Sequence, residues 1–306
     1  MAAPDDPGEV PAPPCRIARR RFLKAAVALA VAGAGTATYA SCIEPTWVEV
    51  TEADLPVPGL PPAWEGRRLA HVTDLHLGPL VPADYLARCL HRTADLDPDL
   101  VVVTGDFVTI GRENYGPRAA RLFRDLAPPL GVFACLGNHD YGLTHRVRQA
   151  VGPSPVAVAL GEVGVRVLSN ESVRLTREGG DLWIAGVEDA WSGRCDPAKA
   201  MADVPPGAPA VMLCHNPDEA ESLAAAGCRA ILSGHTHGGQ IDLPLIGAPI
   251  LPVRHRDRYR GVHRVDGAWL YVNRGLGWLW QVRLGCRPEI ALFTLRAAPP
   301  DLGPAA

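Results

Sequence analysis

Five short polar clusters in this chain carry the side-chain types that bind metal ions. The clusters are Asp74-Leu-His76, Gly105-Asp106, Gly137-Asn-His-Asp140, His215-Asn216 and Gly234-His-Thr-His237. They offer carboxylate, imidazole and amide groups and contain no cysteine, a mixed oxygen and nitrogen set that suits manganese, iron, zinc or cobalt. A single Asp or His after a strand often only caps a turn, but capping does not explain five clusters in series. The clusters therefore indicate a metal site.

Seven of these side chains are candidate ligands, which is more than one ion needs. They are Asp74, His76, Asp106, Asn138, His215, His235 and His237. Residues two apart on an extended chain point to the same side, so the Asp-x-His and His-x-His pairs can each converge on one point. Two ions roughly 3.5–4 Å apart that share one carboxylate would use the whole set. The sequence therefore predicts a two-metal hydrolase.

Apolar runs directly before the clusters predict the elements that position them. The runs span residues 68–73, 100–104, 132–136, 210–214 and 230–233. Their Val, Ile, Leu and Ala content is typical of strands buried on both faces. Further strands are expected at 165–168, 182–187, 269–272 and 290–295, and helices at 82–96, 114–126 and 217–226. Ligands gather outside the carboxyl ends of strands in open α/β sheets, which is where each cluster begins.

The composition limits the classes of function. A net charge of −3 predicts no nucleic-acid partner and disfavours a nuclease. The eight cysteines include no C-x-x-C pair, and we expect free thiols. The residues after position 42 are numerous enough for one large core, so we expect a single catalytic domain. The oligomeric state is left open.

The order of the clusters resembles the calcineurin-like metallophosphoesterase superfamily over about residues 68–296. The resemblance implies an α/β fold, a four-layer α/β/β/α sandwich with two mixed sheets. It also implies ligand sets for the two metals: Asp74, His76 and His237 for one, and Asn138, His215 and His235 for the other. Asp106 would bridge the two ions. His139 would be a catalytic imidazole near the leaving group, oriented by a carboxylate that is either Asp106 or Asp140.

Four shorter segments resemble a bacterial branch of this superfamily, the YkuE/YaeI-like exported or membrane-associated phosphoesterases. The segments are Trp47-Val-Glu-Val50, Gly234-His-Thr-His-Gly-Gly-Gln240, Asn273-Arg-Gly-Leu276 and Arg287-Pro-Glu-Ile290. The resemblance favours phosphodiester or pyrophosphate substrates over simple monoesters. Branch relatives point to glycolipid or nucleotide-sugar lipid substrates such as UDP-2,3-diacylglucosamine, or to other envelope phosphodiesters.

The chemistry implied by two metals is hydrolysis. Two cations of manganese, iron or zinc would lower the pKa of a bridging water and supply hydroxide at neutral pH, and His139 could act as general acid. Two alternatives remain: a phosphomonoesterase of the same fold, and a non-catalytic metal-binding envelope protein. The intact His139 and the seven ligand positions argue against the second.

The N-terminal segment Ala18-Arg-Arg-Arg-Phe-Leu-Lys24 and the apolar run at 25–40 resemble a twin-arginine export signal. This implies the twin-arginine machinery as a partner, which carries folded proteins, and a periplasmic, cell-envelope or membrane-associated location. The run is shorter than the roughly 20 apolar residues of a membrane span, which favours a signal. Cleavage after Ala40 and an uncleaved anchor are both open, and lipidation of Cys42 is disfavoured.

The chain thus divides into four expected parts. Residues 1–42 are the signal or anchor, 43–67 a Pro-rich arm or edge strand, 68–296 the metallophosphoesterase domain and 297–306 a disordered tail. Within the domain, Arg254 and Arg256 are candidate substrate-binding residues, with a solvated charged face as the alternative. Trp278 and Trp280 could touch a membrane surface, although packing inside the domain is favoured.

Overall fold

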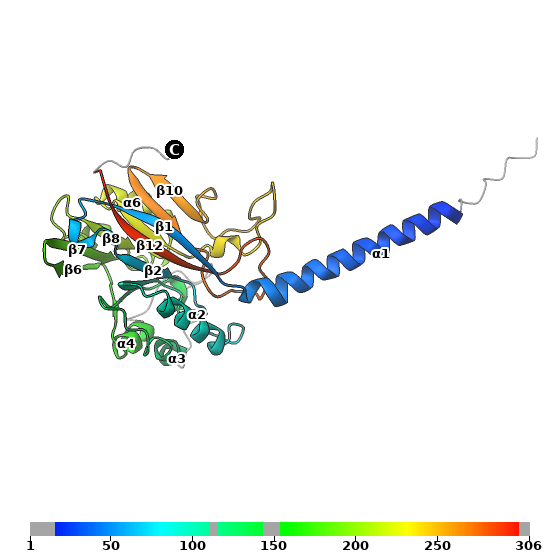
Figure 1. The fold of residues 1–306 in the computed structure, drawn as a ribbon, viewed down its shortest axis with the longest axis horizontal. Helices are drawn as coiled ribbons and strands as arrows, with labels where there is room; N and C mark the ends of the chain where they lie inside the picture. Colours follow the sequence, from blue (N-terminus) through cyan, green and yellow to red (C-terminus); the bar gives the residue numbers. More distant parts are fainter. Residues whose placement is uncertain (1–15, 110–114, 143–153, 300–306) are drawn as a thin grey trace, which may run out of the picture.

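Two six-stranded sheets packed face to face form the body of the protein (Figure 1). The computed structural model describes residues 16–109, 115–142 and 154–299. One apolar cluster lies between the sheets, and two further clusters join each outer face to its helices. The expected α/β/β/α sandwich with two mixed sheets is therefore confirmed.

The first sheet has the order β1-β12-β2-β3-β4-β5. Its strands are β1 (Glu49–Pro58), β12 (Glu289–Ala298), β2 (Arg68–Val72), β3 (Leu100–Thr104), β4 (Val132–Cys135) and β5 (Val165–Val167). The strands β2 to β5 are parallel, and β12 is antiparallel to β2. Alternate residues of β3 face opposite ways: Val101 and Val103 join the outer cluster, and Val102 joins the cluster between the sheets. The outer helices are α2 (Ala83–Asp95), α3 (Tyr115–Arg121) and α4 (Pro155–Gly161).

The second sheet has the order β10-β11-β9-β8-β7-β6. Its strands are β10 (Gly261–Val265), β11 (Ala268–Val272), β9 (Ala230–Ser233), β8 (Ala210–Leu213), β7 (Gly180–Gly186) and β6 (Glu171–Arg177). The four central strands are parallel, and β10 and β6 are antiparallel edges. Two short helices, α5 (Pro197–Ala200) and α6 (Ala220–Ala225), pack on the outer face through Ala200 and Leu223.

Several expectations from the sequence differ from the structure. All five runs before the polar clusters form strands, but the edge strands β6 and β10 were not anticipated. The reason is that β6 is mostly exposed or half-buried and carries charged side chains, so it lacks an apolar run. The helix expected to reach residue 126 ends at Arg121. Of the two expectations for the Pro-rich segment, the structure contains the edge strand, as β1 pairs with β12.

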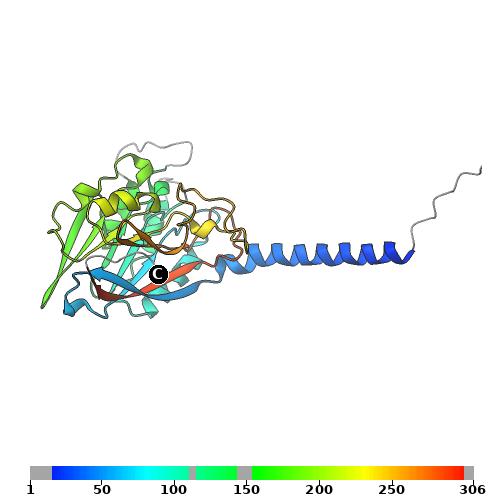
Figure 2. The same ribbon diagram turned by 90° about the horizontal axis from the view of Figure 1, so that it is seen from above.

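A long helix, α1 (Arg16–Thr38), projects away from the sandwich (Figures 1 and 2). The helical segment Arg19–Thr46 is long and apolar enough to cross a membrane, a criterion that a signal sequence also meets. It exceeds the apolar run at 25–40, so length does not exclude a span. Two short helical turns, η1 (Tyr39–Ile43) and η2 (Glu44–Thr46), then join it to β1. Parts of the expected signal and tail, residues 1–15 and 300–306, lie outside the described residues.

The loop between β11 and β12 is organised around Arg283, whose guanidinium is fully buried. Its Nη2 donates to the carbonyl oxygens of Arg274, Gly275 and Gly277, at 3.0, 3.1 and 2.6 Å, and Nη1 donates to Cys286. A Cβ added at Gly275 would lie 2.6 Å from Cβ of Asp74. The loop therefore packs directly under one candidate metal ligand.

Replacing Arg283 with Met should destabilise the protein strongly. The side chain keeps a similar length, but several buried carbonyl groups lose their donor, so we expect a loss of at least about 3 kcal/mol. Urea unfolding followed by circular dichroism measures the change, with Arg88→Met, an exposed arginine on α2, as the control. Equal stability of the two variants would show that Arg283 does not hold the loop.

Candidate metal centre

The seven candidate ligands lie at one end of the sandwich, where parallel strands of both sheets finish. Asp74 and His76 follow β2, Asp106 follows β3, Asn138 follows β4, His215 follows β8, and His235 and His237 follow β9. All seven side chains are buried. The structure therefore brings together six of the seven expected positions, three from each sheet, and buries Asn138 in a neighbouring loop.

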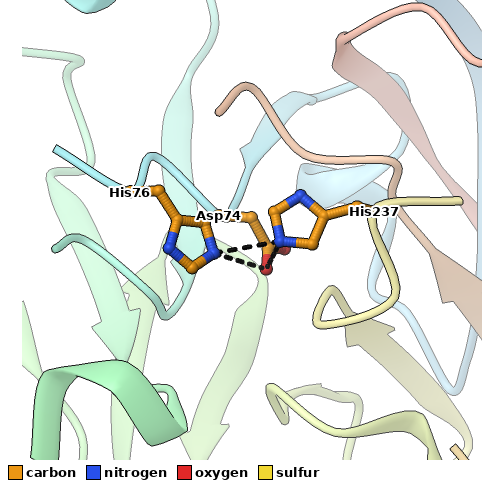
Figure 3. Close-up of side chains that lie close together, drawn as sticks. All are labelled: Asp74, His76 and His237. Atoms are coloured by element: carbon orange, nitrogen blue, oxygen red, sulfur yellow. Dashed lines mark hydrogen bonds and ion pairs between the residues drawn. The ribbon is translucent and has the colours of Figure 1, made fainter. Parts of the chain in front are cut away.

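One group of ligands contains Asp74, His76 and His237 (Figure 3). The two Nε2 atoms lie 3.0 Å apart, and Asp74 Oδ1 lies 3.8 Å from Nε2 of His76 and 3.4 Å from Nε2 of His237. Within the described part of the chain, Asp74 Oδ1 is buried without a hydrogen-bond partner. A buried anionic oxygen and two imidazole nitrogens that share one point fit a divalent cation.

Asp106 joins this group to a second one. Its Oδ2 lies 3.4 Å from Nε2 of His76 and 3.3 Å from Nε2 of His215. His215 Nε2 is in turn 3.1 Å from Nδ1 of His235. Asn138 is buried, and both of its chain neighbours contact Asp106. A Cβ added at Gly137 would overlap Asp106, and the N–H of His139 donates to Asp106 Oδ1. Asp106 thus has the position that a shared carboxylate needs, and the residues fit two metal ions.

Five of the seven candidate ligands have left-handed backbone. The φ angles are 51° at Asp74, 48° at His76, 54° at Asp106, 72° at His235 and 52° at His237. Such a conformation costs roughly 1–3 kcal/mol for each residue other than glycine and persists where the surrounding fold enforces it. Asp74 and His76 converge as expected, but His235 and His237 lie in different groups. The extended backbone assumed for both pairs is also wrong. In each pair, both residues are left-handed and flank one residue between them, so the chain turns at the pair and is not extended.

Charge at the site is set by the histidines around the two carboxylates. Burial disfavours the charged form of Asp74 and Asp106. The pKa of both carboxyls is nevertheless below the usual value, because histidines lie nearby, chiefly His237 beside Asp74 and His215 beside Asp106. Burial, reinforced by His215, lowers the pKa of His235 to about 3. Both carboxylates are therefore ionised and His235 is neutral at pH 7, which are the forms that bind metal.

The Asp140 carboxylate holds the loops at the centre through backbone N–H groups. Asp140 Oδ2 accepts from the N–H of Asp106 and Gly137, and Oδ1 accepts from Phe107 and Val108. Burial and the charge of Asp106 raise the pKa of Asp140, whereas the four N–H donors lower it and fit the ionised carboxylate. Asp140 thus fixes the loop that carries Asp106.

His139 lies beside the cluster with its ring against that of His76, at a centroid distance of 4.8 Å. Its Nδ1 contacts the carbonyl oxygen of Thr109. The expectation that Asp106 or Asp140 orients this ring is therefore wrong, because Asp106 binds the backbone N–H of His139 and Asp140 binds other N–H groups. No sequence signal pointed to Thr109, since any residue supplies a carbonyl group.

Arg254 and Arg256 lie outside the cluster. The backbone N–H of Arg254 donates to Asp218, whose carboxylate is 3.6 Å from its Nε. Arg256 Nη2 donates to the carbonyl oxygens of Ala248 and Pro249. Both arginines thus brace neighbouring loops, and their role in substrate binding stays a prediction.

Comparison with known proteins identifies the family. The profile described as "Calcineurin-like phosphoesterase" matches residues 67–239, more than half of the chain. Phosphodiesterase YaeI of Escherichia coli K12 is 30% identical over 279 residues, 91% of this chain and 99% of YaeI. Uncharacterized metallophosphoesterase YkuE of Bacillus subtilis 168 is 30% identical over 290 residues, 92% and 99% of the two chains. UDP-2,3-diacylglucosamine pyrophosphatase LpxG of Chlamydia trachomatis serovar D is 29% identical over 307 residues, 84% and 92%.

The chain therefore belongs to the calcineurin-like phosphoesterase family, and it is a hydrolase of phosphoric esters. The predicted superfamily and its YkuE/YaeI-like relatives are confirmed. The family uses divalent metals, which agrees with the clustered His and Asp side chains.

Gly234→Ala should reduce metal binding. A Cβ at this position would lie 2.2 Å from Thr73 Oγ1 and 2.4 Å from Asp74 Oδ2, so both side chains must shift from their present positions. We expect roughly 10–100-fold weaker metal affinity, as for lost support of a ligand. Metal titration by calorimetry measures it. Gly161→Ala is the control, because a Cβ there meets no described atom within 4 Å. Unchanged affinity in Gly234→Ala would show that Asp74 can shift without loss of the site.

Proposed function

We propose that this protein hydrolyses phosphodiester or pyrophosphate bonds at a centre of two metal ions. The single observation that carries the proposal is the position of Asp106, whose Oδ2 lies 3.4 Å from His76 and 3.3 Å from His215. A carboxylate at equal distance from two imidazole groups is the arrangement that a bridged metal pair requires. Asp74 and His237 complete one side, and Asn138 and His235 the other. Manganese, iron, zinc and cobalt all suit this set of ligands.

The residues around the centre divide the work of hydrolysis. When bound, the metal ions supply an activated water and neutralise the charge of the phosphoryl oxygens. Asp74 and Asp106 carry the negative charge that retains the cations. Burial of every ligand excludes bulk water, which strengthens each electrostatic contact inside the site.

His139 is the residue that we assign to proton transfer. A carbonyl oxygen only accepts hydrogen bonds, so Nδ1 of His139 carries the hydrogen that points to Thr109. Nε2 is then the nitrogen available to a substrate, and in the protonated ring it can donate to the leaving oxygen. Burial lowers the pKa of His139. A bound phosphate group would oppose this shift, because its negative charge favours the imidazolium form.

The preference for diesters of lipids rests on relatives and on a neighbouring cavity. YaeI is named a phosphodiesterase, and LpxG is named a UDP-2,3-diacylglucosamine pyrophosphatase. In this chain an apolar cavity of about 220 Å³ adjoins His235 and His237, with Leu251, Leu279 and Trp280 in its wall. An envelope glycolipid or nucleotide-sugar lipid is therefore the substrate class that we favour.

Export and location follow from the N-terminal helix. The segment Arg19–Thr46 is compatible with a signal or a membrane anchor and so with the cell envelope. Arg19, Arg20 and Arg21, at the start of this segment, support the twin-arginine route as part of this proposal. Since that route carries folded proteins, the metals would be bound before export. Detection of the protein on the route for unfolded chains would contradict this.

Asp106→Asn tests the two-metal proposal. The neutral amide cannot hold both cations, so we expect metal content to fall and turnover to drop by at least roughly 100-fold. The measurement is hydrolysis of a bis-aryl phosphodiester and an aryl monoester by the full-length protein in manganese, zinc, iron or cobalt. Asp125→Asn, an exposed carboxylate, is the control. Faster monoester than diester hydrolysis would favour the phosphomonoesterase alternative, and two bound ions without any turnover would favour a non-catalytic protein.

His139→Ala separates metal binding from chemistry. His139 is not assigned to either metal, so metal content should stay at two ions per chain while the rate falls roughly 10²–10⁴-fold. Metal analysis and kcat for the diester are measured on the same sample. Loss of the metals in this variant would make His139 a ligand and contradict its role as the general acid.

A further inference from the structure

Apolar side chains are exposed at the end of the domain from which α1 leaves. Leu245, Ile246, Ile250 and Trp280 are 108, 73, 68 and 63% exposed. Three of them lie between η7 (His237–Gly239) and β10, and Trp280 lies between β11 and β12. In Figure 1 these loops, coloured yellow to red-brown, are on the side of the sandwich that faces α1. We call these four residues the apolar rim.

The two loops of the apolar rim are fixed to each other. Gln240 Nε2 donates to the carbonyl oxygens of Trp280 and Val282, both at 2.9 Å, and Gln240 Oε1 accepts from the N–H of Leu279. Asp242 N–H also donates to Leu284 O at 2.8 Å. The side chain of Gln240 is nearly buried, at 8% exposure. The rim is therefore a defined surface and not a set of independent loop tips.

The same loop also receives the end of α1. Arg283 N–H donates to Ala40 O at 2.8 Å, and Cys286 N–H donates to Glu44 Oε1 at 2.6 Å. Ala40 and Glu44 are both buried. Trp280 is thus only three residues from the point where the apolar helix meets the domain. A bilayer that holds α1 would lie against the rim.

We infer that the apolar rim rests on the bilayer that α1 enters, as a second membrane contact beside the helix. Soluble surfaces rarely gather large apolar side chains at one place unless the surface has a partner. Leucine and isoleucine side chains enter the acyl boundary, and tryptophan prefers the level of the lipid head groups. The occupant of the rim is therefore a lipid surface. This inference concerns membrane contact and does not depend on catalysis.

The contact would place the metal centre next to lipid. Ile250 and Trp280 belong both to the rim and to the wall of the cavity that adjoins His235 and His237. A domain held by α1 alone could rotate about the helix end, whereas a second contact fixes which face meets the bilayer. The cavity would then open toward lipids and not toward the aqueous phase.

Tryptophan fluorescence of the full-length protein in nanodiscs tests the inference. The nanodiscs contain phosphatidylethanolamine and phosphatidylglycerol, with or without brominated acyl chains that quench nearby indole groups. The variants are made in a Trp47→Phe background, because Trp47 directly follows the candidate span Arg19–Thr46. The segment Arg16–Thr38 contains no tryptophan, so the remaining quenching reports on the domain. Trp280→Phe should remove roughly half or more of the quenching caused by bromine. Trp183→Phe on β7, whose strand lies far from α1 in Figure 1, should retain it.

A second pair of variants tests the rest of the rim. Leu245→Ser combined with Ile246→Ser should reduce the quenching of Trp280, because the loop then gains less from contact with lipid. Val158→Ser on α4, a position 63% exposed, is the matched control. Equal quenching in the Trp47→Phe background with and without Trp280→Phe would overturn the inference. Quenching unaffected by the double change would also overturn it, since Trp280 would then reach lipid without the rim.

Discussion

The contact on which the rest of the structure depends is the buried Asp106 carboxylate between His76 and His215. His76 belongs to a loop of the first sheet and His215 to a loop of the second. Two ionised carboxylates and several imidazole groups in one buried space are unfavourable unless cations neutralise them. The sandwich therefore has to hold the carboxyl ends of the strands of both sheets close together and keep the side chains there from moving apart. Two hydrogen bonds join the sheets across this space. His215 Nδ1 lies 2.7 Å from Thr104 O, and the His235 N–H lies 2.9 Å from Asp74 Oδ2.

Local strain shows how tightly the fold holds this arrangement. Five candidate ligands have left-handed backbone, which their side chains disfavour. Hydrogen bonds around them enforce it: Asp74 N–H donates to Gly105 O, His76 N–H to Asp106 O, and Asp140 binds the turn at Asp106. Glycine at 137 and 234 leaves space for the two carboxylates, since a Cβ at either position would overlap Asp106 or Asp74. Backbone hydrogen bonds thus support the left-handed conformation at Asp74, His76 and Asp106.

The central strands, and the polar residues that cluster after them, could be predicted from the sequence for one reason. Strands buried on both faces must be apolar, so Val101 to Val103 and Ile231 to Leu232 give clear runs, and any polar cluster after such a run stands out. Edge strands carry no such requirement, and β6 was missed. The left-handed ligands and the Thr109 carbonyl were also missed, because the first depends on tertiary hydrogen bonds and the second on backbone that every residue shares. The order of ligands is thus encoded locally, but their geometry is not.

Cys286 connects the end of the domain that joins α1 to the residues of the candidate metal centre. Its N–H binds the buried Glu44 carboxylate just after α1, and its Sγ donates to the carbonyl oxygen of His237 at 3.1 Å. Burial raises the pKa of Cys286, so the thiol keeps the hydrogen that it donates. A chain cut after Ala40 would lose the buried Ala40 carbonyl oxygen, which accepts the N–H of Arg283 at 2.8 Å. This favours retention of α1, because the junction is a part of the folded domain and not a spacer that follows it.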